Sequence, residues 1–203
     1  MAQLRADAQA NRGKILEGAV ALFAEKGLGA EMKEIAEASS VAVGTLYRHF
    51  PSKDDLLMAV VMEAVGGLLN AGRAADREDD PRVALQVLLT EHFKNVDRYG
   101  WLVKSMFAGQ LPKSCQGRIE AIQADPAIAG QVRRQIQKGI DAGLLRRDLD
   151  VGVSTALLEG VTLPWSYDHF RSGRSPVQSA QAVLGVFLRG AGVEPPIQTL
   201  DHK

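Results

Sequence analysis

The chain has 203 residues, of which 46% are hydrophobic and 24% are charged. This balance is typical of a folded globular protein and excludes a largely disordered chain. The 24 basic and 24 acidic side chains cancel, so the overall charge indicates no polyanionic partner.

The single cysteine, Cys115, cannot form an internal disulfide. The stretch MAQLRADAQANRGK lacks the apolar core of a signal peptide. No run reaches the roughly 18 apolar residues that suggest a membrane span. We therefore expect a cytoplasmic protein with no membrane partner.

Apolar residues recur at helical spacing along almost the whole chain, whereas a convincing period-2 strand pattern occurs nowhere. The first helix is expected from Asn11, and Gly27 stands where a left-handed residue would end it. Its apolar positions are Ile15, Leu16, Ala19, Val20, Leu22 and Phe23. The pattern as a whole predicts an all-α fold of about nine helices.

Two short helices, 32–38 and 43–49, are expected next, separated only by residues 39–42. Ser52 and Asp55 form a capping-box-like start for a fourth helix that continues to about Gly72.

Beyond the polar segment 73–80, Asp80 and Pro81 have the residue types of a helix start. Further helices are expected at 81–93, 99–108, 125–143, 150–170 and 176–190. We also expect a turn at 111–114, a kink at Pro164 and a frayed tail, EPPIQTLDHK.

The two short helices, braced by the longer one before them, have the outline of a helix-turn-helix. In that motif the second helix lies in the DNA major groove, so its inner face is apolar and its outer face small or polar. Leu46 and Phe50 can anchor the inner face, while Thr45, Arg48 and His49 point elsewhere. The segment therefore has the residue pattern of a DNA-reading helix.

Other residues of this segment suit the DNA backbone. Gly44 and Thr45 add little bulk at the start of the second short helix, where backbone atoms must approach the duplex. Tyr47 and Lys53 carry a hydroxyl and an ammonium group that suit phosphate oxygens. Contacts of this kind position a protein on DNA and make its binding salt-dependent.

Three stretches within residues 15–57 carry a family resemblance: ILEGAVALFAEKG, MKEIAEAS and VGTLYRHFPSKDDLL. They resemble the DNA-binding domain of the tetracycline-repressor (TetR) family of transcriptional regulators. The resemblance implies a helix-turn-helix DNA-binding domain at 1–55 and a larger helical ligand-binding and dimerisation domain at 56–203. It also implies a homodimer, a double-stranded DNA operator and a small-molecule effector. The expected DNA contacts are Lys33, Val43, Gly44, Thr45, Tyr47, Arg48, His49 and Lys53.

Three positions depart from the family pattern. Ser39-Ser40 stands where members often have Ala-Gly, so a Cβ must be accommodated where glycine is easiest. Ala42 replaces a small polar residue, and Glu31 would repel a nearby phosphate. Residues 1–55 also carry seven basic and eight acidic side chains. These features leave open a helical ligand-binding or protein-interaction module that has lost specific DNA binding.

The second half of the chain carries weaker signals. The helices expected at 150–170 and 176–190 are apolar on more than one side, which suits pairing with a second subunit. Large side chains on the middle and late helices are candidates for a mainly apolar effector pocket, although core packing is the more frequent role for each. They are Met62, Phe93, Trp101, Met106, Phe107, Trp165 and Tyr167. His92 and His169 are further candidates for a hydrogen bond to a ligand, although a lone histidine is more often structural.

No catalytic motif is apparent. The four histidines are far apart in the sequence, and Cys115 has no second cysteine at zinc-site spacing. We therefore expect no enzymatic activity, no metal and no cofactor. The function expected is that of a transcriptional regulator, in the simplest case a repressor released from a palindromic operator by a small, mainly apolar ligand.

Overall fold

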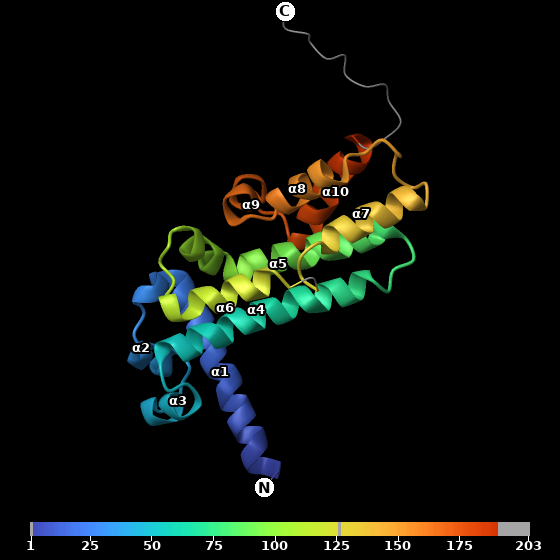
Figure 1. Cartoon of the computed structure of the whole chain (residues 1–203). Coiled ribbons are helices and arrows are strands. Elements are labelled where there is room, and N and C mark those ends of the chain that lie inside the picture. The colour runs from blue at the N-terminus through green and yellow to red at the C-terminus, as the bar shows by residue number, and fades with distance from the viewer. Residues whose placement is uncertain (1, 126, 191–203) are drawn as a thin grey trace, which may run out of the picture.

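The computed structural model describes residues 2–125 and 127–190, and over these residues it contains ten α-helices, one 3₁₀ turn and no strand (Figure 1). The predicted all-α fold is confirmed, with one helix more than the spacing indicates. The first part comprises α1 (Ala2–Lys26), the 3₁₀ turn (Gly27–Gly29), α2 (Met32–Ala38) and α3 (Val43–His49). The larger part comprises α4 (Lys53–Ala75), α5 (Pro81–Phe107), α6 (Lys113–Gln123), α7 (Gln131–Asp141), α8 (Val151–Gly160), α9 (Pro164–Phe170) and α10 (Pro176–Gly190).

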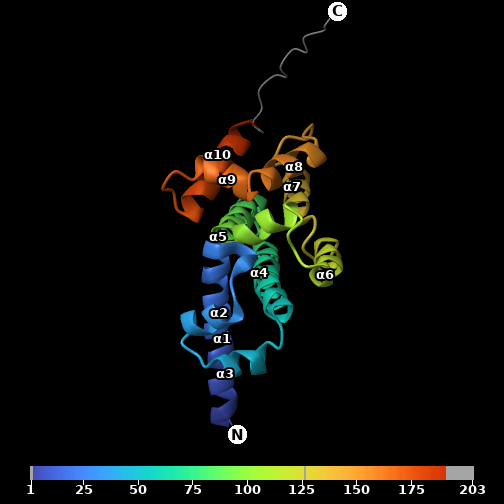
Figure 2. The ribbon, with the colours of Figure 1, turned by 90° about the vertical axis from the view of Figure 1, so that its left-hand side faces the viewer.

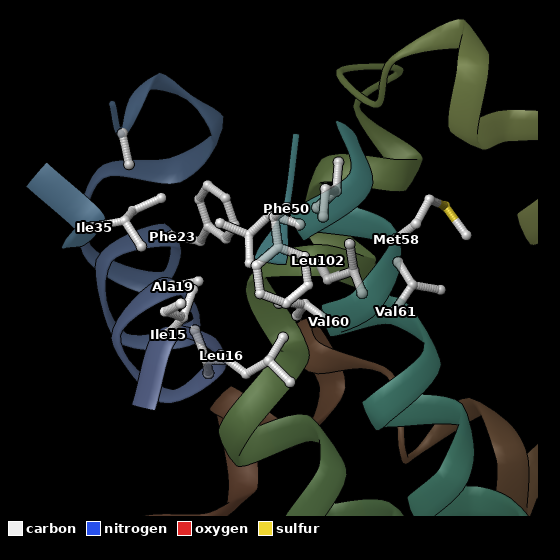
Figure 3. Packing of buried hydrophobic residues seen from close by; sticks show 14 of the residues in the cluster. Ile15, Leu16, Ala19, Phe23, Ile35, Phe50, Met58, Val60, Val61 and Leu102 are labelled. Carbon is white, nitrogen blue, oxygen red and sulfur yellow. The ribbon is translucent and has the colours of Figure 1, made fainter. Parts of the chain in front are cut away.

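Helices α1 to α3 pack around a shared group of buried side chains (Figure 3). Phe23 of α1, Ile35 of α2 and Leu46 of α3 are completely buried. Gly27 has a φ of 63°, so this residue ends α1 in the left-handed region as its position predicts. The predicted bounds of α2 and α3 are confirmed.

Helix α5 is the centre of the larger part. It runs antiparallel to α4 (Figure 1) and also contacts α1, α7, α9 and α10. Helices α8, α9 and α10 gather at the end of the molecule opposite α3 (Figures 1 and 2). The last three helices therefore lie on the side of the molecule away from α3, and α9 runs beside the C-terminal half of α5, where Trp165 contacts Phe107.

The buried apolar residues form two groups. The proximal core joins those of α1–α3 to Leu56, Leu57, Met58, Val60, Val61, Ala64, Tyr99, Leu102, Leu111, Cys115 and Ile119. The distal core comprises Ala71, Ala75, Ala84, Leu85, Leu88, Leu89, Phe93, Val132, Ile136, Leu145, Leu158, Tyr167, Ala180 and Leu184. The proximal core crosses the domain boundary expected at residue 55, so α1–α3 share buried surface with the first turns of the larger part.

The middle of the chain differs from expectation. Helix α5 is continuous where a break was expected between residues 93 and 99, because both parts of it are packed: Phe93 is buried in the distal core, and Tyr99 and Leu102 are buried in the proximal core. Helix α6 (Lys113–Gln123) was not predicted from the sequence, and it begins within the turn expected at 111–114. Its inner face consists of Cys115 and Ile119, which lie four residues apart and are both buried.

The later helices also differ from those expected from the sequence. The expected helix 150–170 is broken into α8 and α9 rather than kinked, with Pro164 as the first residue of α9. A proline lacks the backbone donor that a continuous helix needs, but it suits a first turn. Helix α7 starts after Gly130, whose φ is 75°, and not at residue 125. Pro126 and the tail 194–203 lie outside the described residues.

The ends of two earlier helices extend further than expected. Helix α1 begins at Ala2 rather than Asn11, and its first turns project past α3 (Figures 1 and 2). Alanine, glutamine, leucine and arginine in this stretch have high helix propensity, so the helix continues without an apolar face to bury. Helix α4 continues three residues past Gly72, to Ala75.

Helix α4 is the one helix of the described residues that is long and apolar enough to cross a membrane. Half of its most apolar window is buried inside the protein (50%), and Leu56, Leu57 and Val60 belong to the proximal core. Its apolar character is therefore accounted for by packing within the fold.

Candidate functional site

The turn between α2 and α3 is built by Ser39 and Ser40. Ser39 is buried, and its hydroxyl donates to the carbonyl oxygen of Ile35 at 2.6 Å. Gly18 of α1 lies against Ser39, because a Cβ on Gly18 would come within 2.2 Å of the Ser39 Oγ. Ser40 has a φ of 54°, so it occupies the left-handed conformation that glycine adopts most easily. The turn keeps its geometry despite the departure from Ala-Gly.

Helix α3 separates its two faces as predicted. Leu46 and Phe50 are buried in the proximal core. Tyr47, next to Leu46 on the helix, is 47% exposed, and Val43 is also exposed. Thr45 is half-buried, and its Oγ1 accepts a hydrogen bond from Arg48 Nη2 at 3.3 Å. The side chain that we expect to read DNA bases is therefore held by its neighbour.

The remaining predicted DNA contacts lie around α3. Gly44 and Lys33 are exposed, and His49 is half-buried beside the ring of Phe50. Lys53, at the first turn of α4, donates to the backbone carbonyl of Leu28 in the 3₁₀ turn. This bond was not anticipated from the sequence, and it fixes the lysine stem while its other two N–H donors remain for a phosphate.

The start of α4 is capped as the sequence predicts. The Ser52 hydroxyl accepts from the backbone N–H of Asp55 at 3.1 Å, and the Asp55 carboxylate accepts from the backbone N–H of Ser52 at 3.1 Å. Both contacts satisfy backbone donors that a helix N-terminus leaves unpaired. They fix the first turn of α4, and hence Lys53, relative to the end of α3.

Acidic side chains of the first three helices are held in contacts within the protein. Glu34 accepts from the backbone N–H of Glu31 at 2.9 Å and from Lys26 Nζ at 2.7 Å, and both contacts lower the pKa of its carboxyl group. Glu17 accepts from Arg98 Nη2 at 2.7 Å. Because Arg98 lies outside residues 1–55, the charge count over that range overstates the negative charge near α3.

Helix α1 also reaches α3. The guanidinium group of Arg12 lies 5.4 Å from the ring centre of Phe50, a cation–π geometry. Arg12 itself is exposed. A positive charge on α1 is thereby placed beside the end of α3.

The structure does not bring the seven predicted pocket residues together. Phe93 stacks on Tyr167 in the distal core, with ring centres 4.7 Å apart. Trp101 packs against Phe23 at 5.2 Å, and Met62 is exposed on α4. Exposed Phe107 and Trp165 form an edge-to-face pair at 4.9 Å, and Met106 alone faces the chamber described next.

A central chamber of about 150 Å³ lies between α4, α5 and α6. Its wall is almost entirely aliphatic, and its polar members are Asn95 and Tyr99. The sequence reading missed the lining residues, which include Val61, Ala64, Leu68, Leu102, Val103, Ile119 and Ile122. In the sequence, these lining residues are marked only by helical spacing, and the buried residues of any core helix show the same spacing.

Two further cavities adjoin the central chamber. An open mouth of about 320 Å³, at the end of α5 and along α6, shares Met106, Leu111 and Ile119 with it. A far chamber of about 170 Å³ lies between α4, α5 and the turn from α8 to α9, and it shares Leu68, Asn95 and Val103. The three cavities therefore lie in a row along α5.

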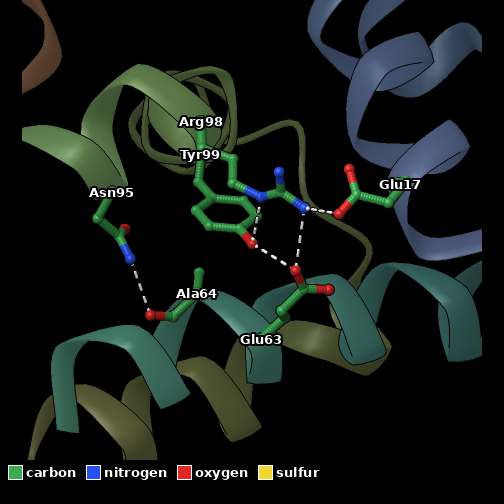
Figure 4. A network of polar contacts seen from close by, with 6 residues as sticks. All are labelled: Glu17, Glu63, Ala64, Asn95, Arg98 and Tyr99. Carbon is green, nitrogen blue, oxygen red and sulfur yellow. Dashed lines mark hydrogen bonds and ion pairs between the residues drawn. The ribbon is translucent and has the colours of Figure 1, made fainter. Parts of the chain in front are cut away.

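A polar network beside the central chamber connects the larger part to α1 (Figure 4). Arg98 donates to Glu17 of α1 at 2.7 Å, to Glu63 of α4 at 3.1 Å and to the Tyr99 hydroxyl at 2.8 Å. Tyr99 in turn donates to Glu63 at 2.8 Å. The hydrogen bond to Glu17 raises the pKa of Arg98, and burial raises that of Tyr99. A residue that lines the chamber is thus two hydrogen bonds from α1.

These features define the chain as a helix-turn-helix DNA-binding protein with a separate apolar cavity. Residues 15–60 match the family described as bacterial regulatory proteins, tetR family. The transcriptional repressor AcnR of Corynebacterium glutamicum is 28% identical over 153 residues, which cover 74% of this chain and 77% of AcnR. The repressor KstR2 of Mycobacterium tuberculosis is 27% identical over 199 residues, or 94% of this chain and 97% of KstR2.

Solved structures of transcriptional regulators have a similar fold. The ketosteroid transcriptional regulator KstR2 has a TM-score of 0.61 and 26% identity, covering 90% of this chain and 95% of KstR2. FadR from Bacillus subtilis in complex with stearoyl-CoA has a TM-score of 0.66 and 20% identity, covering 88% of this chain and 98% of FadR. Residues 15–60 thus match the DNA-binding domain of the TetR family, and the chain is similar to TetR-family transcriptional regulators over most of its length. Because these relatives are regulators, the prediction that it is not an enzyme is confirmed.

Proposed function

We propose that the protein is a cytoplasmic, homodimeric repressor that binds a palindromic operator and leaves it when a small, mainly apolar effector binds. The observation that carries this proposal is the geometry of α3, whose apolar side is fixed in the proximal core while Tyr47 and Val43 face outward. In a two-fold dimer the two α3 helices would enter major grooves one helical turn apart, roughly 34–36 Å.

The dimer interface would be formed by α8 and α10. Leu157 of α8 is 62% exposed and Val186 of α10 is 67% exposed, and Val153 is also exposed on α8. Grouped apolar side chains at a surface are a mark of protein association. A self-complementary contact between two copies of this face would cover them.

The effector would occupy the row of cavities along α5. The aliphatic wall of the central chamber supports an apolar ligand. FadR is a relative in fold whose structure holds stearoyl-CoA, and KstR2 is described as a ketosteroid regulator, so both names point to ligands with large apolar parts. Release from DNA requires that the effector bind the two states of the dimer with different affinity.

The test is selection of binding sites from random double-stranded DNA by the full-length protein without effector. The selected sequence is then titrated at two salt concentrations. We expect a palindrome whose affinity falls steeply with salt. Tyr47→Ala should weaken binding about tenfold across all sequences and leave the salt slope nearly unchanged, whereas Thr45→Val should change the preferred sequence.

A further variant and its matched control test the salt dependence. Lys33→Ala removes a positive charge on α2 and should lower the salt slope by about one. Lys138→Ala makes the same charge change on α7, where the lysine pairs with Asp76, and should leave binding unchanged. If the folded dimer selects no sequence, the alternative of a module that has lost DNA binding takes its place.

A further inference from the structure

The far chamber contains a histidine that the protein itself leaves unsatisfied. The Nδ1 atom of His92 has no contact with solvent and no hydrogen-bond partner. A buried polar atom without a partner is destabilising, and such atoms are rare in folded proteins. The residue as a whole is half-buried, so it is this one ring nitrogen that packing within the protein leaves without a partner.

His92 lies on the same face of α5 as the residues that line the central chamber. Asn95, Tyr99 and Val103 follow it at intervals of three or four residues, so this one face runs along both chambers. Asn95 and Val103 belong to the walls of both. A ligand longer than the central chamber would extend past Asn95 toward His92.

Asn95 is held out of the way of such a ligand. Its Nδ2 donates to the backbone carbonyl of Ala64 at 2.9 Å (Figure 4). Gly67 permits this arrangement, because a Cβ at that position would lie 3.3 Å from the same Nδ2. The passage between the two chambers is thus shaped by a hydrogen bond to α4, while the His92 Nδ1 remains available.

The chemistry of the walls decides which polar group fits. Neither chamber is lined by a lysine, an arginine, an aspartate or a glutamate. Burial lowers the pKa of His92 to about 4, so its ring is uncharged near neutral pH. A carboxylate or an ammonium group beside His92 would lose part of its hydration and find no opposite charge among the lining residues, which is unfavourable. A neutral imidazole can pair with a hydroxyl or a carbonyl group.

We infer that the far chamber recognises an uncharged hydroxyl or carbonyl group at the inner end of an elongated apolar effector, with His92 as the hydrogen-bonding partner. This inference rests on the proposed function, because it assumes that the cavity row is the effector site. It adds a specificity-determining residue and excludes effectors whose inner end is charged.

Four probes of equal chain length test the inference by calorimetry and thermal shift on the full-length protein at neutral pH: n-octane, 1-octanol, 2-octanone and octanoate. We expect the alcohol and the ketone to bind at least about tenfold more tightly than octanoate. His92→Leu should weaken the alcohol and the ketone about threefold to tenfold and leave octane unchanged. His92→Gln, which keeps a hydrogen-bonding group, should restore part of the loss.

The chain offers a matched control. His169→Leu makes the same change at an exposed histidine on α9 that lines neither chamber, and probe binding should not change. Equal loss of all probes in His92→Leu, no loss of the alcohol and the ketone, tight binding of octanoate, or no binding by any probe would each overturn the inference.

The DNA selection experiment separates this result from the proposed function. A protein that selects a palindrome but fails these probe tests keeps its function and loses the role of His92. A protein that binds the alcohol through His92 but selects no DNA has the chamber without the regulator function.

Discussion

The two ends of the molecule differ in how far apart in the sequence their structural determinants lie. In α1–α3, each helix ends at a signal within a few residues of it, such as Gly27, Ser40 or Ser52. In the larger part, α5 contacts helices from both ends of the chain, and its cavities are closed by residues far from it in sequence. The comparison teaches that the proposed DNA-facing surface follows from local sequence, whereas the proposed effector site is made by long-range packing.

The largest expected effect is on the free energy of unfolding, and it tests whether α1–α3 and the larger part unfold separately. Leu46 of α3 is completely buried in the proximal core, which continues into α4, α5 and α6. Leu46→Ala should lower the free energy of unfolding by about 2–5 kcal/mol. Because the core is shared, urea unfolding should remain a single transition, and hydrogen exchange should increase in α4 as well as in α3.

Leu88→Ala is the matched variant in the distal core, where Leu88 is equally buried. It should destabilise the protein by a similar amount, about 2–5 kcal/mol, again in one transition. Two separate transitions in Leu46→Ala, with only the first shifted, would show instead that α1–α3 are an independent module.

The next effect is the pH dependence of stability in the larger part. The folded protein lowers the pKa of His92 from 6.5 to about 4 through burial. As the pH falls from 7 to 4, the unfolded chain takes up a proton at this residue before the folded protein does, so the free energy of unfolding decreases. The loss should amount to at most about 3 kcal/mol.

His92→Leu should remove this contribution, so its stability should fall less between pH 7 and pH 4 than that of the original protein. The measurement is urea denaturation at several pH values, compared by slope rather than by absolute stability. His169→Leu serves as the control. Identical slopes in the original protein and His92→Leu would contradict the burial of this ring.

A smaller effect is expected at the network that joins the two regions. Arg98 contacts Glu17 of α1 and Glu63 of α4, and its partners are partly exposed. Arg98→Met keeps the aliphatic stem and removes these contacts, so α1 should be held less firmly. We expect operator binding to weaken by about 0.5–2 kcal/mol. Lys94→Met, a cation of α5 that pairs only within its own helix through Glu91, should leave operator binding unchanged.

The sequence predicts which residues of α3 are buried and which are exposed better than it predicts the cavity, because the signals for α3 are local. The outward position of Tyr47 follows from the spacing of Leu46 and Phe50 alone. The bond from Lys53 to Leu28 joins residues 25 apart, and no spacing rule predicts it.

Because sequence signals are local, they also did not predict which of the large side chains would line a cavity. Phe93 and Tyr167 are large and apolar, but their packing partners come from distant helices and place both in the distal core. The cavity is lined instead by aliphatic residues that look like any core helix in the sequence. The missing partner of His92 is a property of the packed structure and has no sequence signal.

The smallest expected effect concerns the turn between α2 and α3, where the positive φ of residue 40 favours glycine. Ser40 has a φ of 54°, where a Cβ is unfavourable and glycine is not. Ser40→Gly should therefore stabilise the protein by up to about 1 kcal/mol, reduced by the greater freedom of glycine in the unfolded chain. Ser39→Gly is the matched control, and it should destabilise, because Ser39 is buried and bonded to Ile35. Thermal denaturation of both variants measures the difference, and a loss of stability in Ser40→Gly would mean that the serine side chain itself supports the turn.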